Sequence, residues 1–312
     1  MNIETDYLIL LNDILTNGVE KSDRTGTGTI SVFGRQIRHC MCHGFPLLTT
    51  KKMAVKTMMT ELKWFLKGDT NIKYLVDNNC HIWDGDCYQA YLGKETTPGI
   101  PPHDFVLSKS EFIDKIKTND EFAKKWGELG PIYGKQWRSW TEYYTEKFNG
   151  GNPIIVERTA DQIENLINGL KYNPDSRRHM VSAWNVGDIN DMTLPPCHYG
   201  FQCYVSDGKL SLMWNQRSVD TFLGLPFNIA SYATLLLLLC EETGYKPGDL
   251  IGNLGDVHLY KNHIDQAIEQ MNRHTFPLPE LKVSNVDILN GEFDYELIDY
   301  ECHPSIKAEL SN

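Results

Sequence analysis

The chain has 312 residues, 41% of them hydrophobic, which is enough for one large domain or two small ones. Its 30 basic and 41 acidic residues give a net charge of −11, and such a surface repels nucleic-acid polymers and anionic membranes. The longest apolar run, Leu235–Cys240, is far too short for a bilayer span of about 20 residues, and the first residues lack the basic start and apolar stretch of a secretory leader. We therefore expect a cytoplasmic protein with a small ligand.

The first half of the chain is predicted to contain helices around one strand. Residues 85–128 are typical of a small helical insertion, with short polar helices between Ser110 and Lys125. The elements expected before it are a helix over residues 3–17, a strand from Thr29 to His39 with a break at Gly34, and a helix that is capped by Thr49-Thr50 and ends near Leu66.

The second half mixes strands and helices without a regular βαβ rhythm, which indicates an α+β (mixed α/β) fold. We expect a single domain over residues 1–312, with a large mixed β-sheet packed by helices. The elements expected here are a tight loop over 130–137, an amphipathic helix from Asp161 to Leu170, a strand from Met180 to Trp184, a buried helix from Ile229 to Cys240, and a further strand and helix between Leu250 and Arg273.

The most informative unit is a pair of strand-like runs around Asp207-Gly208. If this dipeptide forms a two-residue type I′ turn, a regular ladder places Cys197 opposite Ser218 and directs Arg217 to the other face of the sheet. For Arg217 to approach the sulfur, the register must break. We therefore predict a β-bulge between residues 198 and 217.

Cys197 is a candidate nucleophile. Two prolines precede it and stiffen the approach to the thiol, and a nearby cation such as Arg217 is what a thiolate needs at neutral pH. The alternative is a buried structural cysteine, because free cysteines are among the most buried residue types. The two interpretations are close to even.

Four arginines could build a local anion site in this acidic protein. Arg24 lies in a glycine-containing loop, Arg177 and Arg178 follow a turn-like segment, and Arg217 lies on the hairpin. A phosphate needs such guanidinium forks. Ordinary solvated charges are the alternative for the arginines in loops.

Glu61 is a candidate proton shuttle. It shares one helix face with Ala54, Met58 and Phe65, and a carboxylate in an apolar stripe has a raised pKa. The alternative, which the sequence alone favours, is a glutamate at the edge of the stripe that reaches solvent.

Several polar and aromatic side chains have two interpretations. Asn228 fits a helix N-cap, but its amide could also read a pyrimidine edge. His258 and Tyr260 share a strand face and could reach a sugar hydroxyl, or could lie on a half-exposed edge strand. Trp83 and Tyr133 are expected to be core aromatics.

Cys40, Cys42 and His43 could form a partial metal site. Ordinary strand and loop thiols are the favoured interpretation, because no second Cys/His pair follows at zinc-finger spacing. The eight cysteines lack a framework spacing, which fits reduced thiols. We therefore expect no bound metal.

A set of stretches, taken together and in this order, is very specific for one family: Asp23–Thr29, Thr49–Lys51, Ile82–Asp84, Tyr133–Arg138, Ser176–Arg178, Ser182–Asn185, Leu194–His198, Gln216–Asp220, Gly224–Asn228 and Asp256–Tyr260. The chain resembles folate-dependent thymidylate synthase over nearly all of its length. The resemblance implies a homodimer, formed through a sheet face, that methylates dUMP to dTMP. The implied one-carbon donor and reductant is 5,10-methylenetetrahydrofolate, and no metal is implied.

The resemblance also implies roles for individual residues. Cys197 would attack C6 of the uracil, and the rest of the implied catalytic group is Glu61, Tyr133, Arg217, Asn228 and Asp220. The implied dUMP ligands are Arg24, His198, Gln216, Arg217, Ser218, Asp220, Asn228, His258 and Tyr260, joined by the partner subunit's Arg177 and the partner subunit's Arg178. The implied folate ligands are Lys51, Ile82, Trp83, Leu194, Asp220, Leu223, Gly224, Phe227 and Ser311.

The chain departs from the family pattern at three places. Asp86 stands where many members have a second tryptophan, Trp214-Asn215 stands where Leu-Tyr is common, and the tail Glu309–Asn312 replaces a small apolar one. A dUMP hydroxymethylase, in which water traps the methylene group, therefore stays open, whereas Asn228 disfavours the dCMP version. A Cys-His hydrolase and a non-catalytic nucleotide-binding protein are weaker alternatives.

Overall fold

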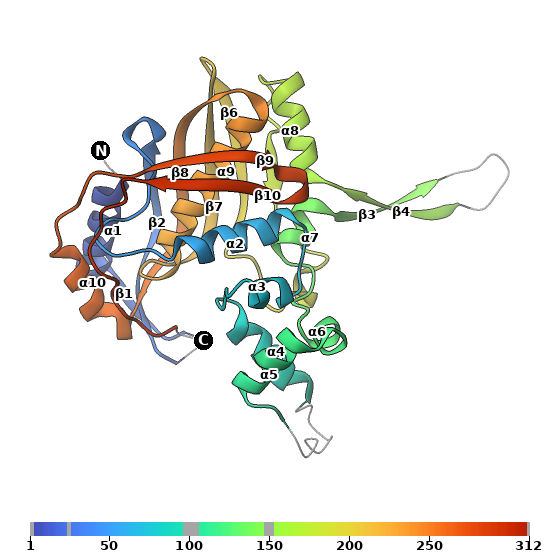
Figure 1. Ribbon diagram of the computed structural model, residues 1–312, viewed down its shortest axis with the longest axis horizontal. Helices are drawn as coiled ribbons and strands as arrows, with labels where there is room; N and C mark the ends of the chain where they lie inside the picture. The colour runs from blue at the N-terminus through green and yellow to red at the C-terminus, as the bar shows by residue number, and fades with distance from the viewer. Residues whose placement is uncertain (1–2, 24–25, 96–105, 147–152, 311–312) are drawn as a thin grey trace.

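The computed structural model describes residues 3–23, 26–95, 106–146 and 153–310, and it contains a large sheet packed by helices (Figure 1). β7 and β8 are parallel, whereas the other neighbours are antiparallel, so the expected α+β class with a mixed sheet is confirmed. The six strands lie in the order β1 (Val19–Lys21), β2 (Thr29–Cys40), β8 (Lys246–Tyr260), β7 (Lys209–Asp220), β6 (His198–Ser206) and β5 (Met180–Ser182).

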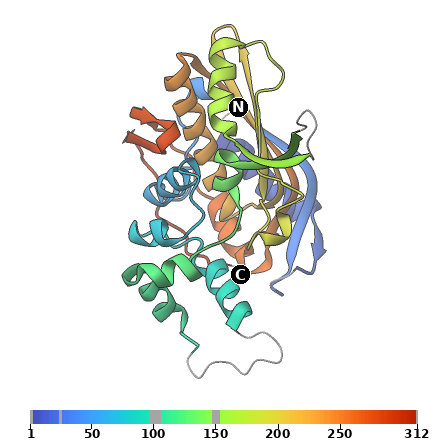
Figure 2. The ribbon, with the colours of Figure 1, turned by 90° about the vertical axis from the view of Figure 1, so that its right-hand side faces the viewer.

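The main helices lie on one face of this sheet (Figure 2). The central one is apolar on nearly all sides and ends at Gly244, which adopts φ +78° as left-handed C-caps do. It is long and apolar enough to cross a membrane, but 67% of its most apolar stretch is buried inside the protein, so it is a core helix. These helices are α1 (Ile3–Asn17), α2 (Val55–Leu66), α8 (Gln162–Tyr172), the central α9 (Gly224–Thr243) and α10 (Ile264–Met271).

A group of short helices extends away from the sheet (Figure 1). Aromatic rings hold it together: the ring centroid of Tyr91 lies 4.9 Å from that of Phe112 and 5.1 Å from that of Trp126. The last two helices of the group match the short helices predicted between 110 and 125. The group consists of α3 (Lys73–Asp77), α4 (Asp84–Glu95), α5 (Lys109–Thr118) and α6 (Asp120–Trp126).

Two hairpins outside the main sheet were not predicted. One pairs β3 (Trp140–Glu146) with β4 (Ile154–Ala160) and projects far from the body (Figure 1). The other pairs β9 (Glu280–Asp287) with β10 (Glu292–Ile298). Short 3₁₀ turns complete the described chain: η1 (Met41–His43), η2 (Ile189–Asp191), η3 (Lys261–His263) and η4 (Ile288–Asn290).

Several local predictions are wrong. The segment predicted as a tight loop contains the helix α7 (Tyr133–Arg138). Asn228 is not an N-cap, because α9 already begins at Gly224. Cys40 and Cys42 form a disulfide, whereas all eight cysteines were expected to be reduced. By contrast, the strand predicted from Thr29 to His39 with a break at Gly34 is confirmed as β2, in which Gly34 takes φ +70° and the β2–β8 register passes from Phe33 to Arg35.

The predicted cap at Thr49-Thr50 is also wrong, because these two residues are hydrogen-bonded to the carboxylate of Glu4 in α1. The N-cap of α2 is Ala54, which makes no side-chain cap bond. Glu4 is fully buried and accepts hydrogen bonds from the backbone N–H of Thr49 and of Thr50, at 2.7 and 2.6 Å. It also accepts from both threonine hydroxyls, at 2.6 and 2.7 Å. This buried carboxylate therefore fixes the chain that leads into α2.

Glu4→Ala should lower the free energy of unfolding by about 3 kcal/mol, because it leaves several buried donors unpaired. Urea unfolding followed by circular dichroism measures this. Glu20→Ala is the control, because Glu20 is largely exposed in its ion pair with Lys261, and its loss should cost no more than about 0.5 kcal/mol. Equal effects of the two substitutions would contradict the stabilising role of the buried Glu4 carboxylate.

Candidate active site

The β6–β7 hairpin has the predicted register and the predicted bulge. Asp207 and Gly208 both have positive φ, +52° and +69°, as a type I′ turn requires. The ladder is regular from the turn to Gly200, and then the register shifts so that His198 pairs with Gln216. Tyr199 is the extra residue of the bulge.

The bulge brings Arg217 to the chain segment of Cys197. The backbone N–H of Arg217 donates to the Cys197 carbonyl at 2.8 Å. Its guanidinium donates to the carbonyls of Pro195, at 2.8 Å, and Pro196, at 3.0 Å. These hydrogen bonds fix the Arg217 side chain against the two prolines, and together they hold the half-buried Cys197 in one position.

Tyr133 connects Cys197 to an aromatic cluster. Its hydroxyl oxygen accepts the backbone N–H of Cys197 at 2.8 Å, so its own proton stays available to donate. Burial raises the pKa of Tyr133 well above its usual value, which keeps the hydroxyl protonated. The ring stacks on His198 with centroids 4.3 Å apart and lies 6.2 Å from Trp83. Trp83 and Tyr133 are buried as expected for core aromatics, but they also border the candidate nucleophile.

His198 is not positioned as a base for the thiol. It is buried, and its Nδ1 is hydrogen-bonded to the Tyr232 hydroxyl at 2.8 Å. Burial lowers the pKa of His198 to about 3, so the ring is neutral at pH 7. This argues against a Cys-His hydrolase. Sequence reasoning missed Tyr232, and no local signal marks it, because Ser231 and Thr234 also carry hydroxyls in the same helix.

Glu61 is a half-buried carboxyl with a pKa near neutrality. Burial raises its pKa to about 7, opposed by a hydrogen bond of 2.8 Å from Trp83 Nε1 to Glu61 Oε1. Its stripe is narrower than predicted, because Ala54 is exposed while Met58 and Phe65 are buried. The result is a group that can both hold and release a proton at pH 7.

The amide of Asn228 is oriented by Gln216. Gln216 Nε2 donates to Asn228 Oδ1 at 3.1 Å and to the carbonyl of Ser218 at 3.0 Å, and Trp214 Nε1 donates to Gln216 Oε1 at 3.2 Å. Among the described residues, Asn228 Nδ2 has no hydrogen-bond acceptor. This donor is therefore available to a carbonyl of a ligand.

Asp220 and Lys51 lie at the end of β7. Asp220 Oδ1 accepts the backbone N–H groups of Phe222 and Leu223, both at 3.1 Å. Lys51 is buried, donates to the Phe222 carbonyl and lies 3.7 Å from the centre of its ring. Burial lowers the pKa of Lys51 to about 7, and the nearby Asp220 opposes this shift.

β8 carries His258 and Tyr260 beside β7. Asp220 pairs with His258 across the parallel strands, and Ser218 pairs with Asp256. β8 has neighbours on both sides, so the edge-strand alternative is wrong. The two rings are in edge contact at 5.2 Å.

The remaining predicted residues lie elsewhere or are not described. Arg177 and Arg178 are exposed in the segment that leads into the edge strand β5, apart from the Cys197 group. Arg24 and Ser311 lie outside the described residues. The half-buried apolar residues Ile82, Leu194, Leu223 and Phe227 pack against the core, and Gly224 begins α9.

The family model for thymidylate synthase matches residues 5–312. A protein of Mycoplasma mobile named thymidylate synthase is 49% identical over 309 residues, which cover 98% of this chain and 99% of that protein. Both similarities span the β6–β7 hairpin, the helix that carries Glu61 and the strand that carries His258. The chain belongs to the thymidylate synthase family.

Proposed function

We propose that this chain converts dUMP to dTMP through a covalent bond between Cys197 and C6 of the uracil. Membership of the family makes the protein a methyltransferase. The observation that carries the assignment of residues is the bulge, which holds Cys197 between the Arg217 backbone and the Tyr133 hydroxyl. The comparisons favour methylation over hydroxymethylation.

The substrate site is proposed to place the phosphate, sugar and base on different strands and helices. Arg217 and Ser218, with Arg24, bind the phosphate, and His258 and Tyr260 bind the sugar hydroxyl. Asn228 Nδ2 donates to O4 of the uracil, with the amide held by Gln216. His198 acts by holding the Tyr133 ring, and Asp220 by ordering the start of α9.

The chemistry divides between four side chains. The Cys197 thiolate adds to C6, a new C–S bond forms, and the electron pair moves through C5 to O4. The Asn228 amide stabilises the charge at O4, and Glu61, poised near neutrality, moves a proton there through water. Once C5 carries the one-carbon unit that the folate would supply, Tyr133 assists removal of the C5 proton, and the C–S bond then breaks so that Cys197 leaves as a thiolate.

The proposed folate site adjoins Asp220. When bound, 5,10-methylenetetrahydrofolate supplies the one-carbon unit and the hydride. Asp220 Oδ1 is taken by two backbone N–H groups, whereas Oδ2 has no donor among the described residues and can accept from a pterin N–H. Leu223, whose backbone N–H bonds to Asp220, is only half buried, and such an apolar surface fits an aromatic ring. The residues proposed to hold the folate are Lys51, Ile82, Trp83, Leu194, Asp220, Leu223, Gly224, Phe227 and Ser311.

A homodimer is proposed through the face of the sheet that the main helices leave open. Tyr204, which is 67% accessible, shares a hollow there with Gln202, Met213 and Ile251. Exposed apolar patches of this kind are typical of interfaces. Arg177 and Arg178 lie exposed at the edge of the same sheet, where they can reach the partner's phosphate site.

We also propose a location in the cytoplasm. The proposed reaction needs a reduced thiol at Cys197, and the cytoplasm keeps thiols reduced.

Cys197→Ala should reduce kcat at least about 1,000-fold, because no other group supplies the nucleophile. Binding of dUMP, measured by calorimetry, should be largely unchanged. Cys302→Ala is the control, since Cys302 is also partly buried, is not in a disulfide and is not among the proposed site residues. Turnover that survives in the Cys197 variant would overturn the covalent mechanism.

Asn228→Asp should lower the preference for dUMP over dCMP at least about tenfold, because a carboxylate repels O4 and accepts from the 4-amino group of cytosine. The ratio of kcat/KM for the two nucleotides measures this. Asn165→Asp, an exposed change on α8, should leave the ratio unchanged. An unaltered ratio in the Asn228 variant would remove this residue as the base reader.

Mixing inactive Cys197→Ala and Arg178→Ala subunits should restore about a quarter of wild-type activity, because half the dimers are hybrids with one intact site. Mixing Cys197→Ala with Glu61→Gln is the matched control. Both of these residues act within one chain, so no site is restored. Absence of recovery in the first mixture would mean that Arg178 does not act across the interface.

A further inference from the structure

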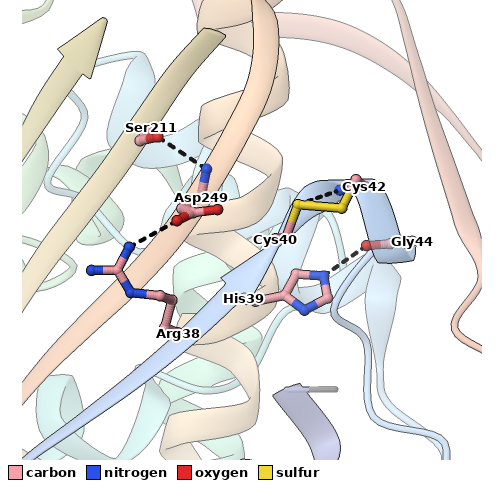
Figure 3. Close-up of a disulfide and its surroundings, with 7 residues drawn as sticks. All are labelled: Arg38, His39, Cys40, Cys42, Gly44, Ser211 and Asp249. Atoms are coloured by element: carbon pink, nitrogen blue, oxygen red, sulfur yellow. Dashed lines mark hydrogen bonds and ion pairs between the residues drawn. A yellow bond between two sulfur atoms is a disulfide. The ribbon is translucent and has the colours of Figure 1, made fainter. Parts of the chain in front are cut away.

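Cys40, Cys42 and His43 form a cluster of possible metal ligands at the end of β2. Figure 3 shows the two cysteines and their surroundings. Cys40 is the last residue of β2, and the chain then turns through η1, which contains Cys42 and His43. The two sulfurs are bonded to each other, and one ligand atom from each of the three residues lies within 4.8 Å of the others. Cys40 is half buried, and Cys42 and His43 are exposed, so the cluster is open to solvent.

The backbone on both sides of the cluster is fixed. Cys40 pairs with Asp249 in the β2–β8 ladder, and the N–H of Cys42 donates to Cys40 Sγ at 3.4 Å. After the turn, the carbonyl of Gly44 is hydrogen-bonded to His39 Nε2 at 2.9 Å (Figure 3), and the N–H of Phe45 donates to the Pro279 carbonyl at 2.7 Å. The ligand residues therefore sit on a short turn that is held at both ends.

The disulfide itself adds little to stability. It closes a loop of only three residues, and the stabilisation that a disulfide gives through the unfolded chain grows with loop length. Two thiols and an imidazole on an accessible turn are instead a ligand set for a thiophilic metal ion. The ligand atoms of tetrahedral zinc lie about 3.5 Å apart, and those of these three residues already lie within 4.8 Å of one another.

We propose that the reduced form of the site made by Cys40, Cys42 and His43 binds one Zn²⁺ ion, and that the disulfide is its metal-free form. A cellular dithiol or glutathione supplies two electrons and two protons to the S–S bond and is itself oxidised to a disulfide. Zn²⁺ then displaces the two thiol protons and is held by two thiolates and an imidazole. The fourth position is left to water, because the turn offers no fourth protein ligand among the described residues. This inference is independent of the proposed reaction.

The test uses the full chain, reduced with a phosphine under argon and freed of the phosphine. Zn²⁺ is titrated against a chromophoric chelator, and Co²⁺ serves as a spectroscopic probe of thiolate and tetrahedral coordination. We expect one tightly bound Zn²⁺ per reduced chain and none in the disulfide form. Cys42→Ser should abolish tight binding, and His43→Gln should weaken it at least about tenfold.

Two further variants locate the bound metal. Cys302→Ser and Cys197→Ser remove thiols that lie outside the cluster and are not in a disulfide, and they should leave the Zn²⁺ affinity unchanged. Binding that persists in Cys42→Ser, or that is lost in Cys197→Ser, would overturn the proposal, as would equal affinity of the reduced and oxidised chains. If Cys42→Ser does not fold, the exposed His43→Gln variant decides, and an unchanged affinity there contradicts the site.

Discussion

A single extra residue in the β6–β7 hairpin sets the geometry on which the proposed active site depends. Side chains along a strand alternate between faces, so a regular ladder would place Cys197 opposite Ser218 and direct Arg217 away. Tyr199 interrupts that alternation, and the backbone of Arg217 then bonds to the carbonyl of Cys197. The guanidinium closes on the two preceding prolines, which fixes the position of the sulfur. Tyr133, Gln216 and Asn228 are all arranged around this unit.

Burial acts in opposite directions on the ionisable groups around that hairpin. Desolvation favours the neutral form of any acid or base, so it raises the pKa of Glu61 to about 7 and lowers that of His198 to about 3. Glu61 can therefore exchange a proton at pH 7, whereas His198 is a neutral structural ring that supports Tyr133. The same cause brings Lys51 to about 7 beside Asp220. Two groups with a pKa of about 7 therefore belong to the proposed site, Glu61 beside Trp83 and Lys51 beside Phe222.

Local sequence patterns were sufficient for the elements that local forces determine. The helix over residues 3–17, the type I′ turn and even the bulge follow from periodicity, turn chemistry and one geometric requirement. The cap at Thr49-Thr50 failed because Glu4, distant in sequence, competes for the same N–H groups. The bonds from Cys197 to Tyr133 and from Gln216 to Asn228 join separate elements, so no spacing rule could reveal them. The folate became an expectation only through the family resemblance.

The most direct test of this account is a product analysis with dUMP and 5,10-methylenetetrahydrofolate. The nucleotides are separated by chromatography while the absorbance of dihydrofolate is followed. The account predicts dTMP and dihydrofolate in equal amounts. Formation of 5-hydroxymethyl-dUMP without dihydrofolate would contradict it, and would mean that water reaches the methylene group before the hydride does.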